Sequence, residues 1–205
     1  MMNYHFTENW FSDDGLSILK ELDSSEKIDL LEIGTFEGKS TIWFLDNILR
    51  NENSTITCVD PWLGYNQDHN SLNSYNEKEV EWDLSKRKTK EIFLHNIVVS
   101  NQSEKVIIKQ GFSDKVLPSL ICENKKYDII FIDGNHTAPY VMMDSVMSWN
   151  LLKVNGIMIF DDYTWGPNRL STLRPKESVD YFISSFGDYI TEVHSSYRKI
   201  IKKIK

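Results

Sequence analysis

Short apolar runs, each followed closely by a glycine or an aspartate, constrain the fold of this chain more than any other feature. They occupy residues 28–33, 54–59, 106–109, 127–132 and 156–160, and stretches with helical patterns separate several of them. The first, fourth and fifth runs are almost continuously apolar, which is typical of strands that helices cover on both faces. The alternation predicts βαβ units and an α/β, Rossmann-like doubly wound fold.

Two further apolar runs, at residues 189–194 and 197–204, complete a predicted sheet of seven strands that is mostly parallel. Only Ser195 and Ser196 separate these two runs, which indicates an antiparallel hairpin at the C-terminal edge of the sheet. Helical patterns at about residues 38–50, 140–152 and 176–185 predict helices on both faces.

We expect a single domain over residues 1–205, because the length suits one core and no linker or repeat divides the chain. Residues 1–27 are expected to form a leading helical segment. Its helix is predicted at residues 7–22, with an apolar side made by Trp10, Phe11, Leu16 and Leu19. The long polar segment at 61–104 ends in a helical pattern and has no other recognisable feature.

The charge and the composition exclude several classes of function. A formal net charge of -7 argues against a nucleic-acid partner, since phosphate binding needs clustered Lys and Arg. Cys58 and Cys122 form no CxxC pair, so no zinc or redox motif is predicted. No apolar stretch reaches membrane-spanning length and no signal-peptide pattern begins the chain, which predicts a cytoplasmic protein without a membrane partner. We interpret the basic cluster near the end as a solvated face of the last strand and a tail: Arg198, Lys199, Lys202, Lys203 and Lys205.

A glycine loop joins the first predicted strand to the first predicted helix. It reads ExGxxxG, with Glu32, Gly34 and Gly38 at the fixed positions, whereas a dinucleotide-binding loop reads GxGxxG. Such glycines let the backbone turn tightly against a ligand at a helix N-terminus. Asp60 ends the second run, where an acid can accept hydrogen bonds from both ribose hydroxyls. We therefore expect a ligand with a ribose and an amino-acid tail but no phosphates; the alternative is that the glycines serve only the turn and close packing.

This loop, together with Asp60, resembles the S-adenosylmethionine-dependent methyltransferases. The resemblance implies that Glu32 and the glycine loop hold the methionine part of the cofactor and that Asp60 holds the ribose. Trp62 or Phe36 would face the adenine, and Ser113 would contact its edge. The cofactor-binding set implied by the resemblance is Glu32, Gly34, Thr35, Phe36, Gly38, Ser40, Asp60, Trp62, Ser113 and Asp133.

Three acids follow the fourth and fifth predicted strands: Asp133, Asp161 and Asp162. In a doubly wound sheet these two strands are neighbours, and ligands bind beyond their carboxyl ends. Carboxylates crowded in a cleft repel one another unless a cation neutralises them. An all-oxygen ligand set favours a hard cation, Mg²⁺ first and then Mn²⁺ or Ca²⁺. The sequence therefore predicts a divalent metal site beside the glycine loop.

His136 follows Asp133 in the motif Asp-Gly-Asn-His. A loop histidine beside a metal and a glycine turn is well placed to act as a general base. The alternative is that its imidazole only caps a turn or the next helix.

The strings at residues 131–136 and 156–163, with the helix between them, resemble the metal-dependent sugar O-methyltransferases of the macrocin and mycinamicin type. The resemblance covers about residues 28–195. It implies that Asp133, Asp161 and Asp162 bind the metal and that His136 is the base. It also implies a small-molecule acceptor with hydroxyl groups, such as a sugar diol or a catechol.

Other functions stay open at this level. A metal-independent methyltransferase and a non-catalytic cofactor-binding protein of the same fold are the alternatives. The glycine spacing argues against a dinucleotide-dependent oxidoreductase. Two segments, residues 3–14 and 163–174, are candidates for mobile coverings of the site. A homo-oligomer is compatible with the sequence, which fixes no oligomeric state.

Overall fold

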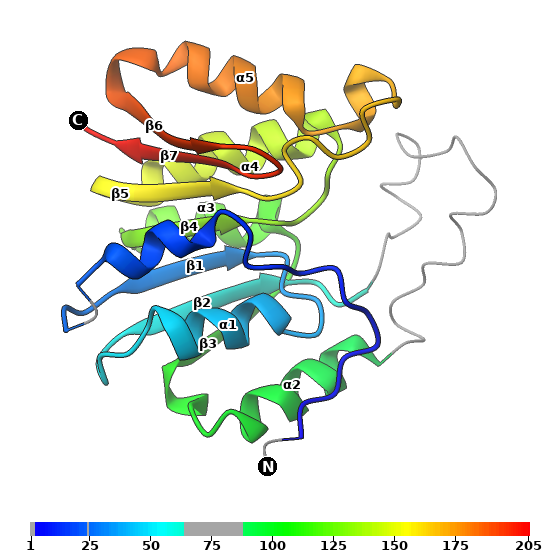
Figure 1. Ribbon diagram of the computed structural model, residues 1–205, viewed down its shortest axis with the longest axis vertical. Helices are drawn as coiled ribbons and strands as arrows, with labels where there is room; N and C mark the ends of the chain where they lie inside the picture. The colour runs from blue at the N-terminus through cyan, green and yellow to red at the C-terminus, as the bar shows by residue number, and fades with distance from the viewer. Residues whose placement is uncertain (1–2, 24, 64–87) are drawn as a thin grey trace.

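A computed structural model describes residues 3–23, 25–63 and 88–205 of the chain, and the predicted segment 61–104 therefore lies partly outside the described residues (Figure 1). The described residues form one seven-stranded sheet in the order β3-β2-β1-β4-β5-β7-β6. Its strands are β1 (Asp29–Ile33), β2 (Thr55–Asp60), β3 (Val106–Gln110), β4 (Tyr127–Ile132), β5 (Leu152–Phe160), β6 (Ile190–Ser195) and β7 (Lys199–Lys203).

The first five strands are parallel, and β1 lies inside the sheet between β2 and β4. In the register, Leu31 of β1 is opposite Thr57 of β2 on one side and Ile130 of β4 on the other. The chain leaves β1 toward β2 and later returns to β4, so strand order reverses beside β1. This is the point at which doubly wound sheets bind ligands.

The predicted hairpin at the C-terminal edge of the sheet is confirmed. The last strand of the chain, β7, is not the edge strand but lies between β5 and β6. β7 pairs antiparallel with β5, and β6 pairs antiparallel with the outer side of β7. The residues just before β7 therefore reach the carboxyl end of β5, because β7 runs against it. This brings Tyr197 and Arg198 beside the acids that follow β5.

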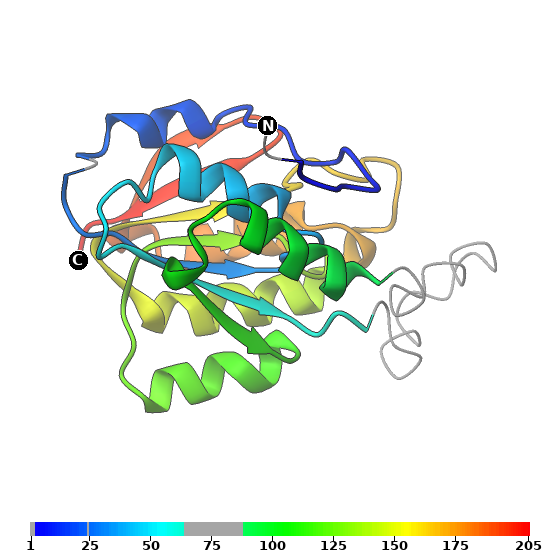
Figure 2. The same cartoon turned by 90° about the horizontal axis from the view of Figure 1, so that it is seen from below.

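Helices cover both faces of the sheet, as predicted. The α-helices are α1 (Lys39–Asn47), α2 (Thr89–Val99), α3 (Ser113–Cys122), α4 (Ala138–Leu151) and α5 (Lys176–Ser185), and the 3₁₀ helices are η1 (Leu16–Glu21), η5 (Ser103–Lys105), η6 (Ser171–Leu173) and η7 (Gly187–Tyr189). Figure 2 shows α1 and α2 on one side of the sheet and α3 and α4 on the other.

Each face of the sheet has its own hydrophobic core because side chains alternate along a strand. Leu30 of β1 packs in the core that includes Phe44 of α1 and Phe93 of α2. Leu31, its neighbour, packs in the opposite core with Leu117 of α3 and Phe182 of α5. The central strands are thus apolar on both faces, which explains their continuous apolar runs.

The leading helix predicted at residues 7–22 is wrong for most of its length. Only η1 is helical there, and the residues before it are irregular. Gly15 takes a left-handed conformation with φ 75° at the start of η1, which separates the helix from what precedes it. Trp10 is 58% exposed, so it does not belong to a helical apolar side. Residues 3–14 instead run across the molecule from η1 to α2 (Figure 1).

Helix α3 was not among the predicted helices. Pro118 lies inside it, and a proline in a helix interior removes a hydrogen bond and weakens the sequence signal. Leu117 and Leu120 are buried and hold the helix on the sheet. Within the part of the chain that the structure describes, no helix combines the length and the apolar character needed to cross a bilayer.

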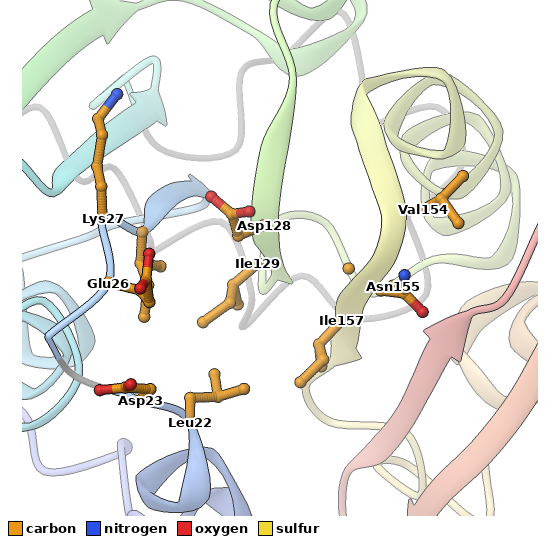
Figure 3. Close-up of a pocket in the computed structure, with 11 residues that line it drawn as sticks. Leu22, Asp23, Glu26, Lys27, Asp128, Ile129, Val154, Asn155 and Ile157 are labelled. Carbon is orange, nitrogen blue, oxygen red and sulfur yellow. The ribbon is translucent and has the colours of Figure 1, made fainter.

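A cavity of about 220 Å³ opens at the amino ends of the strands (Figure 3). Its wall includes Lys27 and Ile28, which directly precede β1, Asp128 of β4 and Asn155 of β5. Two of its charged lining residues form ion pairs: Lys27 with Asp29, and Asp128 with Lys153. The cavity is at the opposite end of the strands from the predicted acids, so it is no part of the site described next.

Candidate active site

The glycine loop after β1 takes a conformation that requires its two predicted glycines. Gly34 has φ 83° and Gly38 has φ 82°, both left-handed. A Cβ on Gly34 would overlap the carbonyl of Asp133, and one on Gly38 would lie 2.8 Å from the ring of Phe93. Gly34 therefore lets the loop after β1 lie directly against the loop after β4. The glycine loop and the first predicted metal acid form one site.

Glu32 lies under this loop and is fully buried. Its carboxylate accepts hydrogen bonds from the hydroxyls of Ser40 and Thr41 at the start of α1. Burial raises the pKa of Glu32 to about 7, although these two bonds oppose the rise. The two predicted cofactor residues Glu32 and Ser40 thus bond to each other, and together they fix the beginning of α1 beneath the loop.

Asp60, at the end of β2, is bonded to the backbone of the glycine loop. One carboxylate oxygen accepts the N–H groups of Thr35 and Phe36 at 2.8 and 2.9 Å, and the other accepts the N–H of Trp62 at 2.6 Å. Burial raises the pKa of Asp60, and the three N–H bonds oppose that rise. Asp60 therefore connects the end of β2 with the loop after β1. Its contact with a ribose stays a prediction.

The two aromatic candidates for the adenine have different surroundings. Trp62 is only 4% exposed, packs 5.1 Å from the ring of Phe93 and donates its indole N–H to the Phe36 carbonyl at 2.8 Å. Phe36 is half-buried and stacks on Trp10, with ring centroids 5.0 Å apart. Trp62 thus supports the loop from below, whereas Phe36 lies nearer the surface. Contact of either ring with a cofactor remains a prediction.

Ser113 begins α3 and faces helix α4. Its hydroxyl bonds to the buried carboxyl of Asp144, whose pKa burial raises to about 7. Asp144 in turn lies under the loop after β4, since one of its oxygens would be 3.4 Å from a Cβ on Gly134. Ser113 is therefore linked to the loop of Asp133 through Asp144.

The acids after β4 and β5 meet at the carboxyl ends of the strands, as predicted. The residues that could hold one ion together differ, however, from the three predicted acids. Within the described ranges, the possible metal-holding group is Asp133, His136 and Asp162, whose ligand atoms all lie within 4.8 Å of one another. His136 Nε2 is 3.2 Å from a carboxylate oxygen of Asp162. Burial raises the pKa of Asp133 well above its usual range, and the negative charges of Asp161 and Asp162 add to this rise. A cation would relieve this crowding, so the donor set fits a divalent metal.

Asp161, the third predicted metal acid, lies outside this group because Arg198 binds it. The guanidinium Nε is 2.7 Å from one carboxylate oxygen and Nη2 is 3.0 Å from the other. Burial raises the pKa of Asp161, and the nearby Arg198 charge opposes the rise. The expectation of three carboxylates around one ion therefore differs from the arrangement found.

The predicted solvated basic face is wrong for two of its residues. Arg198 is 1% exposed and is bound to Asp161, and Lys199 is also buried, where it pairs with Glu192 and lies 5.3 Å from the ring of Tyr163. The sequence grouped them with the terminal lysines because all five are close in the chain. One sequence signal could have shown that Arg198 and Lys199 are buried. Both follow the predicted hairpin turn closely, and such a turn brings the next residues back to the sheet.

Two aromatic residues beside the acids were not predicted as site residues. The hydroxyl of Tyr197 donates a hydrogen bond to the carboxylate of Asp162. Burial raises the pKa of Tyr197, and this hydrogen bond raises it further. Trp165, in the segment 163–174 predicted as a covering, lies with its ring 5.2 Å from that of His136. The guanidinium carbon of Arg169 lies 4.2 Å from the centroid of the same Trp165 ring. This segment therefore forms one wall of the site.

The other predicted covering, residues 3–14, is bonded to the glycine loop. Thr7 donates its backbone N–H to the carboxylate of Glu37 at 2.7 Å and its hydroxyl at 2.5 Å. The buried amide of Asn96 bonds to the backbone of His5 and to the carbonyl of Glu37. The segment thus lies against the loop and helix α2.

Comparison with known proteins agrees with this geometry. Residues 31–163 match the family model described as Methyltransferase domain, and the chain belongs to that family. A curated relative, the uncharacterized protein R132 of Acanthamoeba polyphaga mimivirus, is 26% identical over 186 residues, which are 88% of this chain and 74% of that protein.

Solved structures of methyltransferases share the fold. The O-methyltransferase from Bacillus cereus, in complex with SAH, has a TM-score of 0.65 at 17% identity and matches over 95% of this chain and 82% of its own. TomG of Streptomyces achromogenes, an O-methyltransferase in complex with SAM, has a TM-score of 0.65 at 15% identity over the same shares, 95% and 82%. At these identities the likeness establishes the fold.

Proposed function

We propose that this protein transfers the methyl group of S-adenosylmethionine to a hydroxyl oxygen of a small molecule with the help of a divalent cation. The observation that carries the proposal is the group Asp133, His136 and Asp162, within 4.8 Å of one another beside the glycine loop. The Bacillus cereus and Streptomyces achromogenes proteins, which share the fold, are O-methyltransferases solved with SAH and SAM. They support oxygen as the atom that receives the methyl group.

The glycine loop and Asp60 are placed to bind the cofactor. The loop lies at the switch point of strand order, where a ligand reaches the carboxyl ends of β1 and β4. Gly34 allows the backbone to approach without a side chain between loop and ligand. Asp60, with its carboxylate already oriented by three N–H groups, would receive the ribose hydroxyls. Phe36, the less buried of the two aromatic candidates, would lie beside the adenine.

Asp133 and Asp162 would hold the cation, which, when bound, lowers the pKa of a hydroxyl placed on it. Mg²⁺ is usually held by one or two carboxylates, with substrate and water supplying further oxygens. Two carboxylates in this geometry fit that requirement. Mg²⁺ therefore remains the first candidate.

His136 is placed to take the proton of the acceptor hydroxyl. Its imidazole lies at the same point as the two carboxylates, and the contact of 3.2 Å with Asp162 would orient the ring and stabilise the imidazolium. The acceptor oxygen would then bond to the methyl carbon as the carbon–sulfur bond breaks, and the electron pair would stay on the sulfur of the departing S-adenosylhomocysteine. The protein contributes positioning and charge stabilisation to this displacement.

The wall formed by Trp165 supports a ring-shaped acceptor with adjacent hydroxyls. Its indole is half-buried beside His136, so a flat or ring-shaped molecule could lie on it while a hydroxyl reaches the acids. A sugar diol or a catechol has this shape and two neighbouring oxygens for the cation. These are the acceptor classes that we propose.

Calorimetric titration with S-adenosylmethionine, then with Mg²⁺, tests the proposal on the whole chain. We expect cofactor binding, Mg²⁺ uptake, and formation of S-adenosylhomocysteine, measured by mass spectrometry, from a panel of sugars and catechols. Asp162→Asn should lose Mg²⁺ uptake and turnover, whereas the exposed Asp188→Asn should behave as wild type. Absence of cofactor binding would overturn the proposal.

A metal-independent methyltransferase is the second candidate, and one observation favours it. The contact between His136 and Asp162 already forms a base and its orienting acid without any ion. Turnover that survives EDTA unchanged would establish this reading. Cofactor binding without turnover on any acceptor would instead favour a non-catalytic cofactor-binding protein.

A further inference from the structure

Arg198 is the largest fully buried side chain among the described residues. It lies beside Asp161, at the edge of the group formed by Asp133, His136 and Asp162. It follows the hairpin turn between β6 and β7, where its carbonyl accepts the N–H of Ser196 at 2.8 Å. Its guanidinium meets both carboxylate oxygens of Asp161, at 2.7 and 3.0 Å. Nη2 donates a hydrogen bond to one oxygen, whereas Nε lies close to the other without hydrogen-bond geometry, so one charge-assisted hydrogen bond and the opposite charges hold the pair together.

The third nitrogen of the guanidinium fixes it from the other side. Nη1 donates to the carbonyl of Asp14 at 2.6 Å, and the ring of Phe11 lies 5.4 Å from the guanidinium carbon. Arg198 is therefore held between the N-terminal segment and β5. A side chain hydrogen-bonded through Nη1 and Nη2, with Nε beside the second oxygen of Asp161 and the whole group excluded from water, has little freedom to release Asp161.

Asp161 and Asp162 consequently have different roles although they are adjacent. Both oxygens of Asp161 face Arg198, and one of them also accepts the backbone N–H of Asp162 at 2.9 Å. Asp162 has a left-handed φ of 53°, and its carboxylate points to His136 and Tyr197. The backbone turn at Asp162 thus separates the two carboxylates, and Arg198 keeps them apart.

We propose that Arg198 is a positioning residue that withholds Asp161 from the cation, so that the site binds its metal through Asp133 and Asp162. The inference rests on the proposed function. Charge supports it: Arg198 balances one of the three carboxylates, and one divalent cation balances the other two. If Arg198 were absent, Asp161 would be a buried carboxylate without its partner, next to a cation that it could bind.

The test is Mn²⁺ binding to the whole chain, followed by the electron paramagnetic resonance signal of free Mn²⁺. Arg198→Gln should bind Mn²⁺ about tenfold more tightly than wild type, the size of effect that outer partners of metal ligands show. Arg198→Gln/Asp161→Asn should return to wild-type affinity. Both variants lose the contact with Asp14, so the difference between them reports Asp161 alone.

A second variant tests the proposal if Arg198→Gln fails to fold. Asp161→Asn, with Arg198 intact, should keep Mn²⁺ affinity within about threefold of wild type, whereas Asp162→Asn should lose about tenfold or more. Equal losses in the two Asp variants, or no gain of affinity in a folded Arg198→Gln, would overturn the proposal.

The outcomes also separate this inference from the proposed function. Wild type that binds no Mn²⁺, beside Arg198→Gln that binds it through Asp161, would overturn the metal-assisted function and binding through Asp133 and Asp162, and would support only the withholding of Asp161 by Arg198. Failure of both proteins to bind Mn²⁺ would overturn both. Tight binding by wild type that Asp161→Asn abolishes would leave the metal-assisted function standing and overturn the role of Arg198.

Discussion

Nε2 of His136 lies 3.2 Å from Oδ2 of Asp162, although 25 residues separate the two in the chain and each belongs to a different strand–loop unit. His136 follows β4, and Asp162 follows β5, its parallel neighbour. Because the carboxyl ends of neighbouring parallel strands meet at one edge, the pair is a consequence of the sheet. Their contact forms the chemical centre of the proposed site.

The first prediction concerns His136. His136→Gln removes the proposed base while leaving an amide that can still bond to Asp162, so turnover should fall by about 10²- to 10⁴-fold. S-adenosylmethionine affinity should stay close to wild type, because His136 is not in the glycine loop. Single-turnover methyl transfer and calorimetry measure the two quantities. His95→Gln, on an exposed position of α2, is the matched control and should change neither. Loss of both properties together in His136→Gln would indicate misfolding and not loss of a base.

The second prediction concerns the pH dependence of stability. Burial raises the pKa of Glu32 from 4.5 to about 7, so between these values the folded protein holds a proton that the unfolded chain has released. The contribution of Glu32 is therefore fully present below about pH 4.5 and is lost as pH rises to 7. The total change is about 3 kcal/mol by linkage. Urea denaturation across this range measures it.

Glu32→Gln provides the control for that prediction. The amide cannot ionise but keeps one acceptor for the hydroxyls of Ser40 and Thr41. The free energy of unfolding of this variant should fall less steeply between pH 4.5 and 7 than that of wild type. An identical slope in the two proteins would contradict the assignment of the raised pKa to Glu32.

The third prediction concerns Gly34. Alanine at this position would have to adopt a left-handed backbone conformation, and its Cβ would overlap the carbonyl of Asp133. The conformation alone costs about 1–2 kcal/mol, and the overlap with backbone adds to it. We expect a lower melting temperature and weaker binding of S-adenosylmethionine. Gly187→Ala is the matched control, because a Cβ there meets nothing within 4 Å. Equal stability of the two variants would contradict the close approach of the two loops.

The fourth prediction concerns Asn96. Its side chain bonds to both backbone groups of His5 and to the carbonyl of Glu37, all in a buried position. Asn96→Ala should destabilise the protein by about 1–3 kcal/mol, because it leaves buried polar groups without partners. Hydrogen exchange should become faster in residues 3–14 and in the glycine loop, and much less so in β4 and β5. Unchanged exchange in residues 3–14 would show that other contacts hold the segment.

Much of the fold could be predicted because it follows from local patterns. The strands β1 and β4 and the second half of β5 are largely buried on both faces, so the corresponding runs are almost continuously apolar, and the run at 127–132 matches β4 to the residue. The hairpin at the C-terminus was visible in its short turn. The helix predicted at 7–22 was wrong, because apolar residues there pack singly on Phe36 and Trp43 and not along one helical side.

The site could be predicted in its location but not in its bonding. Glycines and acids at strand ends signal a ligand edge, and the structure places Gly34 and Asp133 in contact there. The partners of Glu32 and Asp60 were not predicted, because a carboxylate has the same sequence signature whether it faces a ligand or a hydroxyl of its own protein. Burial of Trp62 under the loop depends likewise on Phe93, which arrives from a distant helix.

By itself, the sequence determined the succession of the strands, the tight turn at Gly34 and Gly38, and the edge of the sheet to which the acids belong. These features depend on backbone stereochemistry and on the period of apolar residues, which neighbouring residues encode. Only the tertiary structure decided which acids meet a cation and which meets Arg198. That choice depends on side chains 37 and 184 residues apart in the chain, Asp161 with Arg198 and Arg198 with Asp14, which come together only when the last strand returns antiparallel to β5.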